Sequence, residues 1–336
     1  MSIAVPKESH AERPVPAATG GRRLWRWEIL LLLVVAAVFG FNAWASPYFL
    51  DPWTLSDLTF NFTEKAIVAL PMALLIIARE IDISVAGIIA LASVVMGLVA
   101  GAGFGTGAIV AAGCLTGLAA GAVNGALVTT FRVPAIVATI GTMSLFRGVA
   151  YAVLGDQALR DYPDSFAFFG QGYAWGLISF EMVVFAVLAM LTGVVLHVTV
   201  IGRRIKAIGS NPTAAFFSGI RVDRYRFWLF ALVGLASGIA SILLTSRLGS
   251  TRPSIAVGWE LEIITMVILG GVSILGGVGS IAGVVLAALL IGLVTFGLGL
   301  LNVPGIVMSI VTGGLLIGVI ALPILARRLT ARGERP

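Results

Sequence analysis

The sequence predicts an all-α polytopic membrane protein, because long apolar stretches divide it almost end to end and charged residues are scarce. Of its 336 residues, 59% are hydrophobic and 11% are charged, and the mean hydropathy is +1.04. Soluble domains carry about 25% charged residues. A bilayer leaves no water to satisfy backbone groups, and the alternating pattern of a membrane β-barrel is absent. The crossing segments are therefore expected to be helices.

The apolar runs predict about ten crossings, of which the second and eighth are short for a full span of about 20 residues. The expected spans are Ile29 to Ala45, Ala66 to Ala78, Ser84 to Ala102, Ala108 to Thr130, Pro134 to Leu154, Ile178 to Val200, Phe227 to Ser246, Glu262 to Leu275, Ile281 to Leu300 and Pro304 to Leu325. Connections between them are brief. The chain has no room for a large soluble domain.

The basic residues between the spans predict the orientation. Of the 22 Lys and Arg residues, 17 lie on one side of the membrane if the N-terminus is cytoplasmic. By the positive-inside rule, both termini are then cytoplasmic and the number of crossings is even. Residues 1–24, rich in Pro, Ala and Arg, are expected to form a disordered cytoplasmic tail. Residues 25–326 form the transmembrane domain, and residues 327–336 a second cytoplasmic tail. The first apolar run is interpreted as an uncleaved helix, with a cleaved signal peptide as the alternative.

A short internal repeat suggests that the domain consists of two inverted five-helix halves. Val133-Pro134-Ala-Ile136-Val137 recurs as Val303-Pro304-Gly-Ile306-Val307, opening the fifth and tenth expected spans. Segments five crossings apart have opposite orientations, as in many transporters. The fourth span carries a stripe of glycines that predicts close helix packing: Gly113, Gly117, Gly121 and Gly125. Glycines at 270, 271, 276, 277 and 279 predict a tight break between the eighth and ninth spans.

Several classes of function are excluded or disfavoured. The sequence contains no G-x-x-x-x-G-K-[ST] loop for nucleotide phosphates. His10, His197 and Cys114 are too dispersed for a metal site, so no metal or cofactor is expected in this chain. The positive charge follows the span ends, which argues against nucleic-acid binding. No carboxylate lies clearly at the middle of a span, which disfavours proton coupling but leaves sodium coupling open. An intramembrane enzyme lacks any visible pair of nucleophile and base.

The longest cytoplasmic connection, residues 202–226, contains the best candidate for a site of interaction. Asn211 and Pro212 read as N-cap and first helical residue, and Gly219 as the residue past the end, which predicts a helix from Pro212 to Ser218. Its apolar side chains need a cover, either a partner's groove or the membrane surface. The candidate coupling residues are Asn211, Pro212, Ala214, Ala215, Phe216, Phe217, Ser218 and Gly219.

Polar residues within the spans are candidates for a translocation pathway. Arg147 is the one strong charge inside a span; it is expected to face protein or water in the outer half, near Asp156 or Glu181. Interhelical pairing or snorkelling is the alternative to a pathway role. Asp82 or Ser84 is expected to cap the start of the third span. The candidate pathway residues are Asn124, Thr139, Thr142, Arg147 and Thr295, any of which could instead join neighbouring helices.

Three motifs resemble those of the ribose, xylose, rhamnose and autoinducer-2 branch of ABC importer permeases. They are Ile81-Asp82-Ile83-Ser84-Val85, then Ala207-Ile208-Gly209-Ser210-Asn211-Pro212 with Ala214-Ala215 and Ser218-Gly219-Ile220, then Val267-Ile268-Leu269-Gly270-Gly271 with Gly276-Gly277. The likeness covers residues 27 to 325. Many members carry two glycines where this chain has Arg79 and Glu80. The Arg-Glu-Ile-Asp version, with Leu298 to Pro304 later, looks most like rhamnose-type permeases.

The resemblance implies a ten-helix permease of the bacterial inner membrane that works with separate subunits. These are an ATPase, which would hold ATP and magnesium, a second permease that is identical or related, and a periplasmic sugar-binding protein. In this family Asn211 to Gly219 corresponds to the loop that docks on the ATPase. The expected function is import of rhamnose or a similar monosaccharide. Import of autoinducer-2 or a pentose by the same mechanism, or sodium-coupled secondary transport, remains open.

Overall fold

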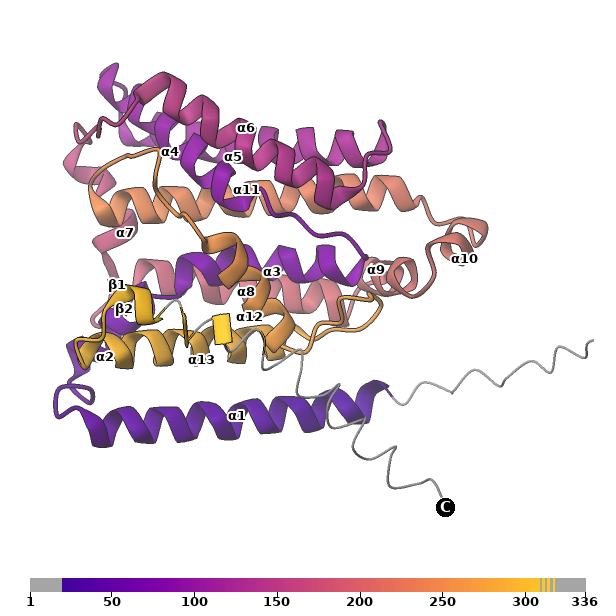
Figure 1. Cartoon of the computed structure of the whole chain (residues 1–336), viewed down its shortest axis with the longest axis horizontal. Helices are drawn as coiled ribbons and strands as arrows, with labels where there is room; N and C mark the ends of the chain where they lie inside the picture. The colour runs from indigo at the N-terminus through magenta and orange to yellow at the C-terminus, as the bar shows by residue number, and fades with distance from the viewer. Residues whose placement is uncertain (1–19, 309, 312, 315–316, 318–336) are drawn as a thin grey trace, which may run out of the picture.

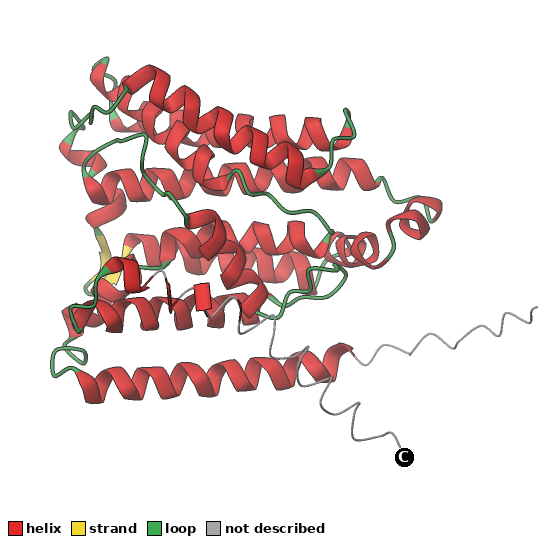
Figure 2. Cartoon of the chain, in the orientation of Figure 1, coloured by secondary structure: helices red, strands yellow, loops and turns green. Residues whose placement is uncertain are grey.

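The computed structural model describes residues 20–308, 310–311, 313–314 and 317, and shows a bundle of helices that run side by side (Figure 1). One two-stranded antiparallel sheet, β1 with β2, is the only sheet within these residues (Figure 2). The elements are α1 (Gly20–Ala45), α2 (Pro52–Phe60), α3 (Thr63–Ile77), α4 (Val85–Gly101), α5 (Thr106–Thr129), α6 (Ala135–Leu154), the 3-10 helix η1 (Asp164–Phe166), α7 (Phe168–Gln171), β1 (Tyr173–Trp175), β2 (Ile178–Ser179), α8 (Phe180–His197), α9 (Val200–Ser210), α10 (Pro212–Phe217), α11 (Val222–Leu248), α12 (Trp259–Leu269) and α13 (Ile281–Leu300).

Six of the described helices are long and apolar enough to cross a membrane: α1, α5, α6, α8, α11 and α13. A seventh crossing is available if α2 and α3, which meet at a bend of 46°, count as one broken span. The apolar helix α4 has 17 residues and α12 has 11. The second and eighth spans are indeed short or broken. The prediction placed the eighth at Glu262 to Leu275, but its helix ends at Leu269, where the glycine-rich turn begins.

Both ends of the chain are described only in part. α1 begins at Gly20, so five residues expected in the disordered tail are helical, whereas residues 1–19 lie outside the described residues. The tenth expected span, Pro304 to Leu325, is described only in part, with helix at 305–308, and the predicted tail 327–336 lies outside the described residues.

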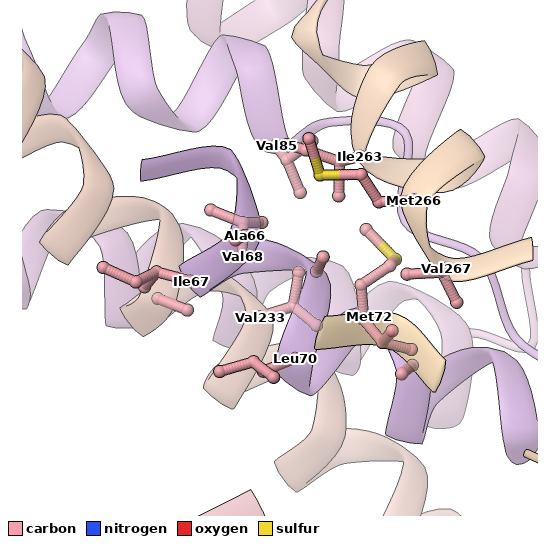
Figure 3. Packing of buried hydrophobic residues seen from close by; sticks show 14 of the residues in the cluster. Ala66, Ile67, Val68, Leu70, Met72, Val85, Val233, Ile263, Met266 and Val267 are labelled. Carbon is pink, nitrogen blue, oxygen red and sulfur yellow. The ribbon is translucent and has the colours of Figure 1, made fainter. Parts of the chain in front are cut away.

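The core lies around α3 and α11. Every residue of α3 except Lys65 is buried, although Pro71 interrupts its hydrogen bonding. Figure 3 shows Met72 on α3, Val233 on α11 and Met266 on α12 converging in one apolar cluster. Flexible Met side chains fill the irregular space where the short helix α12 meets the bundle. Burial on all sides explains why α3 reads as continuously apolar rather than amphipathic.

The glycine stripe of α5 makes the close helix packing that was predicted, and its partner is α11. A Cβ placed on Gly117 would lie 2.4 Å from the carbonyl oxygen of Gly234, and one on Gly121 would lie 2.4 Å from that of Phe230. Glycines on both helices therefore allow backbone to touch backbone. In a membrane, where lipid gives helices no hydrophobic reason to associate, such close packing supplies much of the attraction.

The two copies of the Val-Pro repeat have similar local backbones. Arg132 and Asn302, each two residues before the proline, take left-handed conformations with φ of 59° and 57°. The next residue then donates back to the preceding helix: Val133 N to Leu127 O at 3.1 Å, and Val303 N to Leu298 O at 3.0 Å. A helix starts after each proline, since Ala138 N bonds Pro134 O and Met308 N bonds Pro304 O.

The bundle has two distinct ends. The small elements α2, α7, β1 and β2 lie at one end, and α9 and α10 project from the other, which we call the α10 end (Figures 1 and 2).

Candidate coupling site at the α10 end

The short helix α10 forms for local reasons that the sequence displays. The Oδ1 atom of Asn211 accepts a hydrogen bond from Ala214 N at 3.0 Å, and Pro212 occupies the first turn. The helix ends at Phe217, one residue before the predicted end, and Gly219 has a φ of +82°, which L side chains rarely adopt. Ser218 Oγ donates to Ala214 O and so helps to close the last turn.

One apolar side chain of α10 packs against the bundle, and two others are exposed on its surface. Ala215 is buried against the bundle. Phe216 and Phe217 are 65% and 82% exposed, and their rings stack edge to face with centroids 5.7 Å apart. Two neighbouring exposed phenylalanines on a helix this short form an apolar patch that a partner can cover.

Backbone contacts join the end of α9 to two other segments. A Cβ on Gly209 would lie 1.7 Å from the carbonyl oxygen of Ile77, at the end of α3, so only glycine fits there. The same oxygen accepts a hydrogen bond from Gly277 N at 2.9 Å. The residues before α10 are thus in direct contact with α3 and with the glycine-rich turn between α12 and α13.

Side chains after α3 strengthen this junction. Arg79 donates through Nε to Leu275 O at 2.6 Å and through Nη2 to Ser210 O at 3.1 Å. Its φ is +68°, a conformation in which glycine is far less strained. Arg79 thus takes a glycine-like conformation while its side chain bridges the two segments.

An ion pair connects the same turn to α11. The Nε atom of Arg226 lies 3.0 Å from Oε1 of Glu80, with both side chains mostly buried. Burial raises the pKa of Glu80, and the positive charge of Arg226 opposes that shift. These contacts therefore couple the segment before α10 to α3, to α11 and to the turn before α13.

The predicted side-chain cap on α4 is absent, because Ser84 is the N-cap residue and its side chain accepts no hydrogen bond from the helix. Asp82 and Ser84 instead form a wholly buried polar cluster with Asn124 just before the helix. Asp82 Oδ1 accepts from Ser84 N at 2.8 Å and from Ser84 Oγ at 2.6 Å. Asn124 on α5 donates to Asp82 Oδ2 at 3.2 Å and to Ser84 Oγ at 2.7 Å. Burial raises the pKa of Asp82, while these hydrogen bonds favour its charged form. The structure thus brings three of the predicted site residues into one cluster.

Arg147 has different neighbours from those expected. Its Nη1 atom donates to Pro253 O at 2.9 Å and to Ile255 O at 3.1 Å, and Nη2 donates to Ala86 O at 3.1 Å. The expectation that it lies near Asp156 or Glu181 is wrong. The segment between α11 and the short helix α12 is irregular, and Arg147 satisfies carbonyl groups that a bilayer could not.

The other candidate pathway residues are dispersed. Thr139 is buried and donates to Ala135 O, and buried Thr142 donates to Thr139 O, both within α6. Thr295 on α13 donates to Ile291 O and borders a cavity of about 450 Å³ that also contains the 2.5 Å ion pair of Lys65 with Glu262. A role for these residues in translocation remains a prediction.

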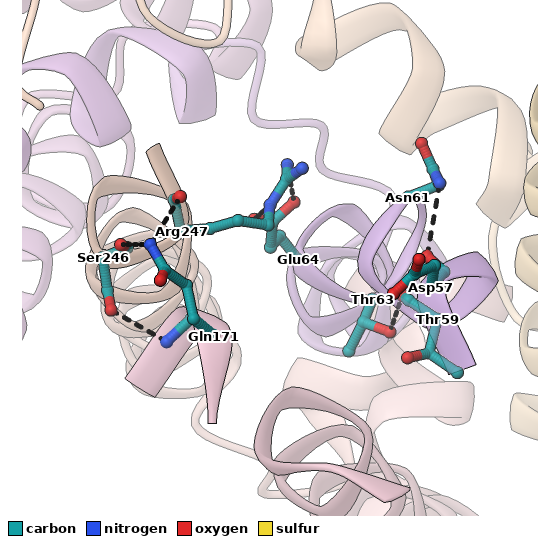
Figure 4. A network of polar contacts seen from close by, with 9 residues as sticks. Asp57, Thr59, Asn61, Thr63, Glu64, Gln171, Ser246 and Arg247 are labelled. Atoms are coloured by element: carbon teal, nitrogen blue, oxygen red, sulfur yellow. Dashed lines mark hydrogen bonds and ion pairs between the residues drawn. The ribbon is translucent and has the colours of Figure 1, made fainter. Parts of the chain in front are cut away.

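A charge pair at the opposite end of the bundle was not predicted from the sequence. Glu64, at the start of α3, is completely buried and accepts from Arg247 on α11 at 2.8 and 3.0 Å (Figure 4). Glu181 is also completely buried, and among the described residues its carboxylate has no hydrogen-bond partner. Glu64 and Arg247 are 183 positions apart, so only their presence at span ends could have suggested the contact.

Comparison with known proteins assigns this sequence to a family. Residues 54–320 match the family described as the permease component of branched-chain amino acid transport systems. The chain belongs to this family. It is also similar to permeases for other solutes: it is 33% identical over 282 residues to an L-arabinose ABC transporter permease of Azospirillum brasilense, a match that covers 83% of each chain.

Two further relatives show the same extent of similarity. A ribose import permease of Bacillus subtilis is 32% identical over 82% of this chain and 84% of its own. An autoinducer 2 import permease of Yersinia enterocolitica is 34% identical over 84% of this chain and 87% of its own. No solved structure matches the chain. The matched region contains the junction of α3, α9 and the turn before α13, so the family likeness includes the candidate coupling site.

Proposed function

We propose that this chain is the membrane-spanning permease subunit of an ATP-driven, binding-protein-dependent importer of a monosaccharide. The observation that carries the proposal is the exposed phenylalanine pair of α10, held on a junction of three backbone segments. Membership of the permease family and the arabinose, ribose and autoinducer 2 permeases among the relatives support it. The subunit moves its substrate without transforming it.

The proposed topology has ten crossings in two inverted halves, with both termini in the cytoplasm of a bacterial inner-membrane protein. The matching left-handed turns at Arg132 and Asn302 support the inverted halves. In this topology the crossings beyond the six long helices would be the broken span of α2 and α3, the short helices α4 and α12, and a segment that begins with the helix at 305–308. The excess of Lys and Arg supports a cytoplasmic location for the α10 end.

The proposed partners are an ATPase at the α10 end, a second permease, and a periplasmic sugar-binding protein at the opposite end. Closure of the ATPases would displace α10, and the junction through Gly209, Arg79 and Arg226 would pass that displacement to α3, α11 and α13. The two permeases would then rock so that a central cavity opens alternately to each side. ATP and magnesium would be held by the ATPase.

The proposed substrate is rhamnose or a similar deoxysugar. The Arg79-Glu80-Ile81-Asp82 motif supports this choice, and the relatives make a pentose or autoinducer-2 the alternative. Uptake by vesicles containing the permease, its ATPase and its binding protein distinguishes these substrates. ATP-dependent uptake of L-rhamnose in preference to arabinose, ribose and autoinducer-2 supports the proposal. Preference for one of the others replaces the substrate but keeps the mechanism.

A sodium-coupled carrier is the second candidate, since backbone carbonyls can bind sodium without a carboxylate at mid-span. The same vesicles distinguish it. Uptake that follows an imposed sodium gradient and ignores both ATP and the ATPase would overturn the ABC mechanism.

A further inference from the structure

A basic groove lies between α9 and α11 at the α10 end. It encloses about 640 Å³, and its mouth is formed by Arg204 on α9 and by Arg221 and Arg224 at the start of α11. Its walls deeper along α11 are Trp228, which is 54% exposed, and Leu232. The groove therefore changes from cationic to aromatic to aliphatic along a single helix.

An apolar cleft adjoins the groove at Leu232. This cleft, of about 240 Å³, lies between α3, α8 and α11 and shares Leu232 with the groove. Its other walls include Leu191 and Ile239. Trp228 and Ile239 are eleven residues apart on α11, or about 16 Å along the axis. That length is close to one leaflet of the hydrocarbon core, roughly half of 30 Å.

The three arginines at the mouth have no carboxylate partner among the described residues. Four ion pairs occur among the described residues, and their cations are Lys65, Arg132, Arg226 and Arg247. The lining of the groove contains no acidic side chain. Arg204 donates to the hydroxyl of Tyr225 at 2.9 Å, which fixes its guanidinium at the mouth. Nearby Asp223 is already paired with Arg132 and Glu80 with Arg226, so neither neutralises this charge.

We propose that this groove binds an anionic phospholipid, with its phosphate at Arg204, Arg221 and Arg224 and an acyl chain along Leu232 toward Ile239. Guanidinium groups bind phosphate oxygens through paired, charge-assisted hydrogen bonds. Tryptophan is favoured at the level of lipid headgroups, and basic pockets between membrane helices on the cytoplasmic side suit anionic headgroups. The adjoining apolar cleft favours a lipid over free phosphate or an acidic side chain of the ATPase, which would need only the arginines at the mouth.

Native mass spectrometry of the full chain in detergent tests the proposal. The protein is incubated with equal amounts of phosphatidylglycerol and phosphatidylcholine with identical chains, and separately with the phosphatidylglycerol headgroup lacking chains and with inorganic phosphate. Wild type is expected to retain phosphatidylglycerol at least tenfold over phosphatidylcholine, and to bind neither chain-free compound at the same concentration. Equal retention of both lipids, or equal affinity for the lipid and its free headgroup, would overturn the proposal.

Variants assign the binding to this groove. Arg221→Gln with Arg224→Gln is expected to weaken phosphatidylglycerol binding roughly 25-fold, from the usual contribution of a cation near anionic lipid. Leu232→Trp should weaken phosphatidylglycerol binding without changing the charge, because the larger side chain fills the space where the groove and the cleft adjoin. Arg203→Gln removes an exposed charge that does not border the groove and should leave binding unchanged. If the double variant binds lipid like wild type but loses affinity for the ATPase, an acidic partner occupies the mouth instead, and the lipid proposal fails.

Discussion

Replacing both exposed phenylalanines of α10 by serine should separate the permease from its ATPase without unfolding it. The rings are 65% and 82% exposed, and a buried phenylalanine covers about 200 Å², so roughly 300 Å² of apolar surface is available to the partner. At about 25 cal/mol per Å² this amounts to ~7 kcal/mol. Ordering and incomplete coverage reduce the realised part to about 3 kcal/mol, or roughly 150-fold in Kd.

The variant should keep its fold because the groups that hold α10 are untouched. Asn211 still caps the helix, Ala215 stays buried, and neither phenylalanine ring packs on the bundle. The matched control is Phe104→Ser, which removes a phenylalanine that is 58% exposed in the turn between α4 and α5. Conservative replacement of the pair by leucine should restore most of the affinity.

The assay is binding of the purified ATPase to the permease in nanodiscs, measured by biolayer interferometry with the ATPase concentration varied. We expect the affinity for the ATPase to fall by about two orders of magnitude for Phe216→Ser with Phe217→Ser. The affinity should be unchanged for Phe104→Ser. An unchanged Kd for the double variant, with the protein still monodisperse, would refute the assignment of α10 as the docking element.

Three further predictions concern packing, buried polar groups and pH, each followed by thermal unfolding of the full chain in detergent. Arg147→Met should lower the free energy of unfolding by about 2 to 5 kcal/mol, because it leaves the carbonyl groups of Pro253 and Ile255 without a donor. Arg147→Lys should restore part of that stability. A Met variant as stable as wild type would contradict this role of Arg147. Gly117→Ala should cost about 1 to 3 kcal/mol because its Cβ meets Gly234 O at 2.4 Å, whereas Gly148→Ala, in open space on α6, should cost nothing. Burial raises the pKa of Asp82, so the folded protein binds this proton more tightly than the unfolded chain does. Its contribution to wild-type stability then falls as pH rises above the ordinary value of 3.8. Asp82→Asn should abolish that part of the slope, and a stability difference between wild type and variant that is constant from about pH 4 to about pH 8 would contradict it.

The parts that the sequence predicts well depend on local rules. Asn211, Pro212 and Gly219 define α10 to within one residue, because capping and left-handed backbone are properties of a few neighbouring residues. The apolar runs locate most spans for the same reason. The stripe on α5 predicts its own packing face, since small residues four apart lie on one side of a helix.

The parts that the sequence predicts poorly depend on distant contacts. Two partners of Arg147, Pro253 and Ile255, lie more than 100 positions away in the segment before α12, and the third, Ala86, lies 61 positions away at the start of α4. The sequence does not indicate which carbonyl groups approach the guanidinium. The second span was expected to begin at Ala66 because Glu64 and Lys65 are charged, yet both belong to α3 and find opposite charges on α11 and α12. The sequence predicts that a charged residue is buried only when its partner in the fold is known.

Reconstitution tests whether this chain is a passive pathway that a separate ATPase drives. Proteoliposomes holding the permease alone are compared with proteoliposomes that also hold the ATPase, ATP and the binding protein, and accumulated labelled sugar is measured against an ion-gradient control. The account predicts accumulation only in the complete system with hydrolysable ATP. Accumulation against a gradient by the permease alone would contradict it.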